Sequence, residues 1–218
     1  MNILLLNTST NKIEFGYFEN TQVIFEKSLE NEFNADILNY LLLDSFKNNG
    51  KKIKNVEAVS IVNGPGSFTG LRVGSAIAKG ICAVTNSLLI EINALDLICN
   101  KYKDKLDRKM TVVPLIPANT KEMEFYYAEY LIENKKMNRI SDYKIDIFDN
   151  IFSEESFFLI NEKVKYNFSK NTEIINLENI SNIKSQFELT ELKISNKEIS
   201  DYKTSEPFYI KKFTPLKK

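Results

Sequence analysis

The chain has 218 residues, of which 43% are hydrophobic and 27% charged, so it is long enough to bury the core of one large or two small domains. Lys and Arg together number 29, as do Asp and Glu, and this balance excludes an overall basic surface of the kind that holds nucleic acid. The sequence has no histidine, which removes the commonest general base and metal ligand together with Ser-His and Cys-His nucleophiles.

The first half of the chain alternates between strand and helix patterns. Apolar runs and period-2 alternation predict strands at residues 3–6, 13–17, 23–25, 56–62 and 88–92. Apolar residues at helical spacing predict helices over 35–46, 71–84 and 93–102. This β-β-β-α-β-α-β-α order is the unit of the ribonuclease H-like and actin/sugar-kinase folds, in which helices flank a mixed sheet.

The second half opens in the same way, with strand-like runs at residues 111–116, 124–132 and 143–148. We interpret this as a weak internal duplication. The predicted fold is therefore α/β and two-lobed, with an N-terminal lobe over 1–103 and a degenerate second copy over 104–218. Beyond residue 148, only 157–160 and 173–177 are candidate strands, and residues 149–206 receive no functional assignment.

Residues 63–70, which read Asn-Gly-Pro-Gly-Ser-Phe-Thr-Gly, are the most informative turn because they hold three of the seven glycines. The helix that follows leaves its first amides free, which suits an anion or a packed carbonyl. The glycine spacing matches neither the dinucleotide fingerprint nor a P-loop. A tight turn without a ligand therefore stands beside the alternative of an anion site, whose candidate residues are Gly64, Gly66, Ser67, Thr69 and Gly70.

Two helices of the first lobe are predicted to meet a partner protein. The helix over 71–84 is rich in Gly and Ala, so another backbone can approach it closely. The helix over 35–46 is apolar in nearly every direction, more than one sheet can cover. Together they predict a helix-bundle interface that buries about 1,500 Å² in total. The alternative is that the C-terminal half of the chain covers them. The candidate interface residues are Ile37, Leu38, Leu41, Leu42, Phe46, Arg72, Gly74, Ser75, Ala78 and Lys79.

Cys82 and Cys99 are the only cysteines, and both lie in predicted helices, where buried free thiols are usual. Residues 1–6 have no basic segment and too short an apolar run for a signal peptide, and no stretch reaches the length of a membrane span. We therefore expect a cytoplasmic protein that makes no membrane contact.

Catalysis by this chain alone is not indicated. Two distant cysteines without histidine do not make a zinc site, and the missing histidines also argue against a metallopeptidase, a label that relatives with this fold have carried. An ATP-dependent small-molecule kinase of the same fold is the main alternative function. It requires an aspartate at the end of the first strand, where this chain has Asn7, and an amide does not neutralise a divalent cation. No catalytic residue and no metal ligand is therefore assigned.

Four stretches resemble the TsaB family, also called YeaZ. The strongest are ILLLNTST at residues 3–10 and IVNGPGSFTGLRVGSAIAKGI at 61–81, followed by EFYYA at 124–128 and PFYIK at 207–211. The chain departs from the family pattern at four places: Asn7 replaces Asp, Pro117-Ala118-Asn119 replaces Asp-Ala-Arg, Lys211 replaces Arg, and Phe33-Asn34 stands where a histidine is common.

The resemblance implies a bacterial scaffold protein that helps to make threonylcarbamoyladenosine next to the anticodon of ANN-decoding tRNAs. It implies pairing with a homologous catalytic subunit, TsaD, and work with the ATPase TsaE, while tRNA is reached through the complex. A homodimer in the absence of TsaD is also compatible with it. No cofactor is expected on this chain alone, whereas the complex uses ATP and the threonylcarbamoyl-adenylate that TsaC supplies.

Overall fold

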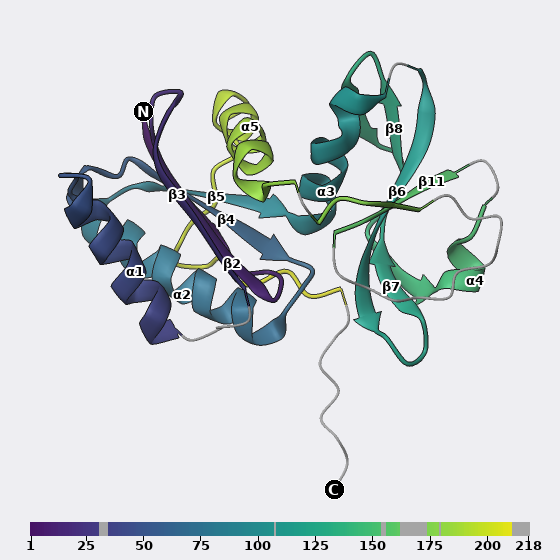
Figure 1. The fold of residues 1–218 in the computed structure, drawn as a ribbon, viewed down its shortest axis with the longest axis horizontal. Helices are drawn as coiled ribbons and strands as arrows, with labels where there is room; N and C mark the ends of the chain where they lie inside the picture. Colours follow the sequence, from purple (N-terminus) through teal and green to yellow (C-terminus); the bar gives the residue numbers. More distant parts are fainter. Residues whose placement is uncertain (31–34, 107, 154–155, 162–173, 179, 211–218) are drawn as a thin grey trace, which may run out of the picture. The chain divides into compact units, whose positions relative to one another are not determined.

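The computed structural model describes residues 1–30, 35–106, 108–153, 156–161, 174–178 and 180–210. The chain divides into two compact units, Met1–Leu97 with Ser181–Pro207 and Ile98–Ile180 with Phe208–Lys218 (Figure 1). This division differs from the boundary predicted between residues 103 and 104, because residues 181–207 return to the first unit. No helix in the described ranges is long and apolar enough to cross a membrane.

The first unit contains a 5-stranded mixed sheet in the order β3-β2-β1-β4-β5. Strands β1, β2 and β3 are antiparallel neighbours, whereas β4 and β5 run parallel to β1. The strands are β1 (Asn2–Asn7), β2 (Lys12–Glu19), β3 (Gln22–Glu30), β4 (Ala58–Gly64) and β5 (Leu88–Asn93). The helical elements are α1 (Ala35–Asn48), the 3₁₀ turn η1 (Ile53–Asn55), α2 (Phe68–Thr85), α3 (Ala94–Tyr102), which extends past the division, and α5 (Asn182–Ser195).

Both faces of this sheet are covered, α1 and α2 lying on one side and α5 on the other (Figure 1). Alternate residues of β1 therefore enter different cores. Leu4 and Leu6 pack with residues of α1 and α2. Ile3 and Leu5 pack with Ile183 and Phe187 of α5. This two-sided cover explains why residues 3–6 are continuously apolar.

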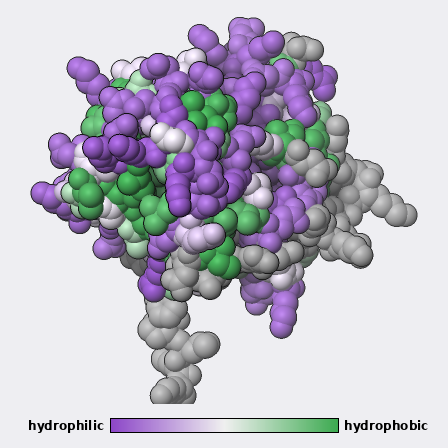
Figure 2. Space-filling view, turned by 60° about the vertical axis from the view of Figure 1, so that its left-hand side comes forward, coloured by the Kyte–Doolittle hydropathy of each residue, from purple (hydrophilic) through white to green (hydrophobic). Residues whose placement is uncertain are grey.

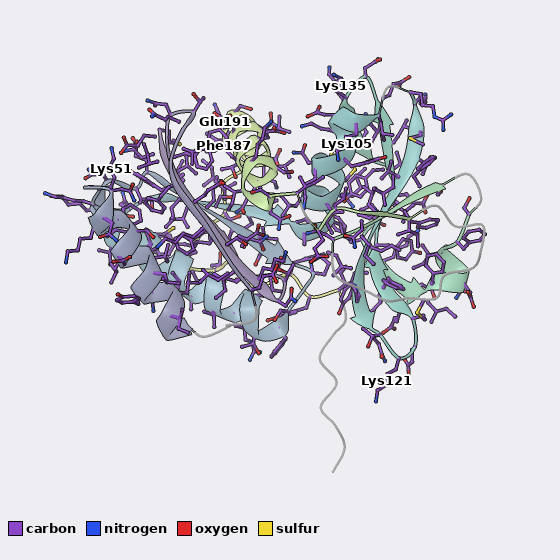
Figure 3. All side chains as sticks on the ribbon, viewed as in Figure 1. Lys51, Lys105, Lys121, Lys135, Phe187 and Glu191 are labelled. Atoms are coloured by element: carbon purple, nitrogen blue, oxygen red, sulfur yellow. The ribbon has the colours of Figure 1, made fainter. Side chains whose placement is uncertain are left out.

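Helix α5 was not predicted, although it supplies half of the cover of the first sheet. Its Phe187 stacks on Phe18 of β2, with ring centroids 4.2 Å apart, while Glu191, one turn later, is exposed (Figure 3). The side chain of the fully buried Gln186 donates hydrogen bonds to the carbonyl oxygens of Leu6 (3.2 Å) and Ser60 (3.1 Å). These bonds attach the helix to the two central strands of the sheet.

The second unit contains a 7-stranded sheet whose main path is β10-β7-β6-β11-β12, while β8 pairs with both β6 and β9. Along this path, β10, β7 and β6 are antiparallel neighbours and β6, β11 and β12 are parallel, the same pattern of directions as in the first sheet. Its elements are η2 (Lys103–Lys105), β6 (Met110–Asn119), β7 (Glu124–Tyr127), β8 (Tyr130–Glu133), β9 (Lys136–Arg139), β10 (Lys144–Ile147), α4 (Phe148–Ile151), β11 (Ser156–Ile160) and β12 (Ile174–Asn176).

Two mixed sheets with helices on their faces confirm the predicted α/β fold class. The strand predicted over 124–132 is in fact two strands, since β7 and β8 pair with different parts of β6. Strand β9 was not predicted.

Candidate functional site

The glycine-rich turn joins β4 to α2, and three amides where the turn meets the helix have partners within the chain. Ser67 is the N-cap of α2, and its hydroxyl accepts a hydrogen bond from the amide of Gly70 at 3.2 Å. The amide of Ser67 donates to the carbonyl of Ser9 at 2.7 Å. The amide of Leu71 donates to the carbonyl of Ser67 at 2.8 Å. Helix α2 therefore begins at Phe68, three residues before the predicted start at residue 71, and the amides of Ser67, Gly70 and Leu71 are not available to an anion.

The glycines of the turn are explained by close packing against the hairpin between β1 and β2. A Cβ added at Gly66 would come within 3.0 Å of the carbonyl oxygen of Ser9, a separation that real Cβ atoms essentially never show. The same holds at Gly70 against the carbonyl oxygen of Thr8, and at Gly74 against the Thr8 hydroxyl. That hydroxyl donates to the carbonyl of Gly70 at 2.8 Å. Of the two interpretations of this turn, the packing therefore favours the tight turn.

Side chains at the end of β1 form a hydrogen-bond network with β2 and with the first turn of α5. The buried Asn7 accepts bonds from the amide (3.1 Å) and hydroxyl (2.7 Å) of Ser9, and its side-chain amide donates to Glu14 at 3.3 Å. Glu14 is also buried, and both the backbone and the side chain of Asn182 donate to its carboxylate. The Glu14 carboxylate thus holds the first turn of α5.

This donor set does not fit the metal-nucleotide site that a kinase of this fold needs. The side chain of Asn7 carries no charge, and the carboxylate of Glu14 already accepts hydrogen bonds from the side-chain amides of Asn7 and Asn182. Within the described part of the chain, no group of three Asp, Glu or Cys residues is arranged to hold a metal ion.

An apolar groove of about 550 Å³ lies between α1 and α2. Its lining includes Asn39 and Leu43 of α1 and Ile77, Gly80 and Val84 of α2. Leu43 and Val84, which line the groove, are 60% and 85% exposed. Tyr40, which lies on α1 three residues before Leu43, is 67% exposed. Figure 2 brings forward the side of the molecule that is at the left in Figure 1, where hydrophobic residues reach the surface in patches among hydrophilic ones. Large apolar side chains exposed this close together are typical of a contact surface.

The predicted interface residues lie in α1 and α2, but most of them face inward. Leu38, Leu42 and Phe46 pack in the core against the sheet, and Gly74, Ser75 and Ala78 of α2 are buried as well. Burial leaves five of these positions no surface for a partner, whereas Leu42, although only 2% exposed, lines the groove. Ile37, Leu41 and Lys79 are half-buried, and Arg72 is exposed with its guanidinium 3.9 Å above the ring of Phe68.

The outward face is formed instead by residues that the sequence analysis did not select, which are Tyr40, Leu43, Ala76, Gly80 and Val84. The sequence shows an excess of apolar residues in α1. It does not show which of them point to the sheet.

Comparison with known proteins identifies related sequences. The family model described as tRNA N6-adenosine threonylcarbamoyltransferase (TsaD) matches residues 34–197. The tRNA threonylcarbamoyladenosine biosynthesis protein TsaB of Buchnera aphidicola (subsp. Acyrthosiphon pisum) is 26% identical over 62% of this chain and 59% of its own length. TsaB of Haemophilus influenzae is also 26% identical, over 57% of this chain and 52% of its own. The chain thus spans little more than half the length of these curated relatives.

A shorter match joins the chain to the tRNA N6-adenosine threonylcarbamoyltransferase of Ehrlichia canis, which is 50% identical over 44 residues, or 20% of this chain and 13% of the relative. Among solved structures, YeaZ from Pseudomonas aeruginosa superposes with a TM-score of 0.77 over 95% of this chain and 99% of its own. Its sequence is only 15% identical, so this similarity concerns the fold.

Proposed function

Since this chain belongs to the tRNA N6-adenosine threonylcarbamoyltransferase family and, within it, to TsaB (YeaZ), we propose that it is a non-catalytic scaffold subunit. In this proposal it pairs with a TsaD-like catalytic subunit for threonylcarbamoylation of the adenosine next to the anticodon of ANN-decoding tRNAs. The TsaE-like ATPase, the tRNA, ATP and threonylcarbamoyl-adenylate are met by the complex and not by this chain alone.

The observation that carries the proposal is the open apolar groove between α1 and α2. Full burial of one large aliphatic side chain contributes about 1.5–3 kcal/mol. Leu43 and Val84 are more than half exposed, so most of that stabilisation is still available to a partner. A stable pair buries roughly 1,200–2,000 Å² in total, and the outer face of two helices of 14 and 18 residues offers a surface of that order.

A TsaD-like subunit is the occupant that we favour. The family model that matches this chain is the TsaD model, so the two proteins are homologous and are expected to present similar helices. Two related helix pairs can pack ridges into grooves as a four-helix bundle.

The absence of chemistry on this chain is a separate part of the proposal. Asn7, Ser9 and Glu14 are joined by hydrogen bonds, the amide of Ser67 donates to the neighbouring hairpin, and the amides of Gly70 and Leu71 donate to Ser67. These contacts support a subunit that acts by binding and leaves the reaction to its partner.

The test is to mix the purified full chain with its cognate TsaD-like subunit and to measure mass by size-exclusion chromatography with light scattering. The matched variants are Leu43→Lys in the groove and Leu192→Lys on α5, because both leucines are exposed on helices, at 60% and 54%. We expect a 1:1 complex with the unchanged chain and with Leu192→Lys, and at least tenfold weaker pairing with Leu43→Lys. Separate elution of the two unchanged proteins at micromolar concentration would refute the proposal, and equal pairing by both variants would move the interface away from the groove.

A further inference from the structure

Gly80 differs from the other glycines of the chain because no contact with the described residues requires a glycine there. Gly66, Gly70 and Gly74 are packed against Thr8 and Ser9, and a Cβ at Gly16 would be 3.1 Å from the side chain of Ile183. Gly50 and Gly64 have positive φ values of 64° and 117°. At Gly80, by contrast, an added Cβ would have no heavy atom of the described residues within 4 Å, apart from the backbone of its own helix, and φ is not positive.

The position of Gly80 makes this costly for the isolated chain. It lies in the interior of α2, five residues before the helix ends at Thr85, and it is exposed. Glycine at such a position destabilises a helix relative to alanine, because it loses more backbone freedom on folding. The chain thus gives up helix stability at an outward-facing position where alanine would fit.

Gly80 also lines the apolar groove between α1 and α2. Ala76, one turn earlier, and Val84, one turn later, line the same groove and are exposed as well. The side of α2 that lines the groove therefore carries little side-chain bulk at Ala76 and Gly80, and the larger side chain of Val84 follows one turn later. Leu43 of α1 lies along the groove and is 60% exposed.

We propose that Gly80 is the point at which a helix of the TsaD-like partner crosses α2, with the two backbones in close contact; this inference rests on the function proposed above. Packed helices have axes about 8–10 Å apart, and a glycine at the crossing allows the short end of that range. A helix is the element that fits, because it satisfies its own backbone hydrogen bonds and so enters an apolar groove without leaving polar groups unpaired. A large apolar side chain of that helix fills the groove beside Leu43 and Val84.

The proposal predicts opposite effects of one substitution on stability and on pairing. In the full chain, Gly80→Ala raises the midpoint of thermal unfolding by about 2–4 °C, because alanine favours the helix. The same variant pairs with the TsaD-like subunit at least tenfold more weakly, and Gly80→Leu at least a hundredfold more weakly, because each added carbon separates the helices. Pairing is measured by isothermal titration calorimetry and unfolding by circular dichroism.

The control is Glu191→Ala, an exposed position in the interior of α5 where alanine also favours the helix. It is expected to leave pairing unchanged, which separates the effect of the crossing point from that of a more stable helix. If the unchanged chain pairs normally and Gly80→Ala pairs equally well, the crossing point is refuted while the scaffold function stands. If the unchanged chain does not pair at all, the scaffold function itself fails.

Two further outcomes would also overturn the inference. A fall in the unfolding midpoint of Gly80→Ala would mean that Gly80 serves the fold of this chain. A variant that loses a homodimer by light scattering but keeps its affinity for the TsaD-like subunit would mean that the helix crossing α2 belongs to a second copy of this chain.

Discussion

Gly70→Ala is the sharpest test of the packing between the glycine-rich turn and the first hairpin. The added Cβ would come well within 3.0 Å of the carbonyl oxygen of Thr8, which is backbone and therefore cannot rotate away. The strand end and the helix start must move apart, and overpacking of this kind costs about 1–3 kcal/mol. The movement also breaks the 2.8 Å hydrogen bond from the Thr8 hydroxyl to the carbonyl of Gly70, which adds about 0.5–1.5 kcal/mol. The expected loss is therefore about 2–4 kcal/mol.

That loss is a large part of the roughly 5–15 kcal/mol by which a domain is stable. It is measured by urea unfolding followed by circular dichroism and by tyrosine fluorescence, since the chain has 10 tyrosines and no tryptophan. The matched control is Gly80→Ala, the same substitution in the same helix, which is expected to be stabilising. A Gly70→Ala protein within about 0.5 kcal/mol of the unchanged chain would refute the packing argument and reopen the interpretation of this turn as an anion site.

Two other predictions concern titrating groups in the first unit and at its edge. Cys82 and Cys99 are buried, and burial raises the pKa of the Cys82 thiol, so a thiol reagent is expected to label neither cysteine in the folded chain and both in urea; rapid labelling of the folded chain would contradict this. Burial and the nearby carboxylate of Glu19 raise the pKa of Tyr17 from 10.0 to about 12, so the folded chain holds the phenolic proton more tightly than the unfolded chain. This stabilisation is fully present below pH 10 and is lost between pH 10 and 12, to a total of about 2–3 kcal/mol. Tyr17→Phe should remove that part of the decline in urea unfolding measured from pH 9 to 12, and an identical decline in both proteins would refute the assignment.

The strands and helices of the first unit could be predicted because their apolar patterns follow from their surroundings. Strand β1 is continuously apolar since both of its faces are buried. Helix α5 could not be found in this way because its buried face carries Ser185, Gln186 and Thr190, which bond to backbone and hydroxyl groups of the sheet and of α3. In the sequence, polar residues on the buried face of a helix have the same spacing as polar residues on an exposed face.

The second unit shows another limit. Residues Ala128 and Glu129 separate β7 from β8 without a glycine, proline or asparagine to mark a turn. Periodicity therefore continues across them, and one long strand was predicted. The direction change depends on β6, which offers different stretches to the two strands.

Six of the ten candidate interface residues are buried in the first unit, so the sequence did not distinguish the inner sides of α1 and α2 from their outer sides. In α1, apolar residues point in all directions, so the sequence does not distinguish Leu38 and Leu42, which reach the sheet, from Tyr40 and Leu43, which do not. That distinction depends on how the helix is rotated about its axis, which is set by packing against the aromatic cluster that includes Phe46.

Gly74 and Gly80, both inside α2, show why the same residue type needs two explanations. Gly74 faces inward, and the Thr8 hydroxyl occupies the space that a Cβ would need. Gly80, six residues later, faces outward, and the described residues leave that space empty. If the low bulk of α2 served only its own fold, alanine at Gly80 would improve the protein without any loss. Gly74 is explained by its contact with the first hairpin of this chain, and for Gly80 we propose a contact with a helix that another molecule supplies.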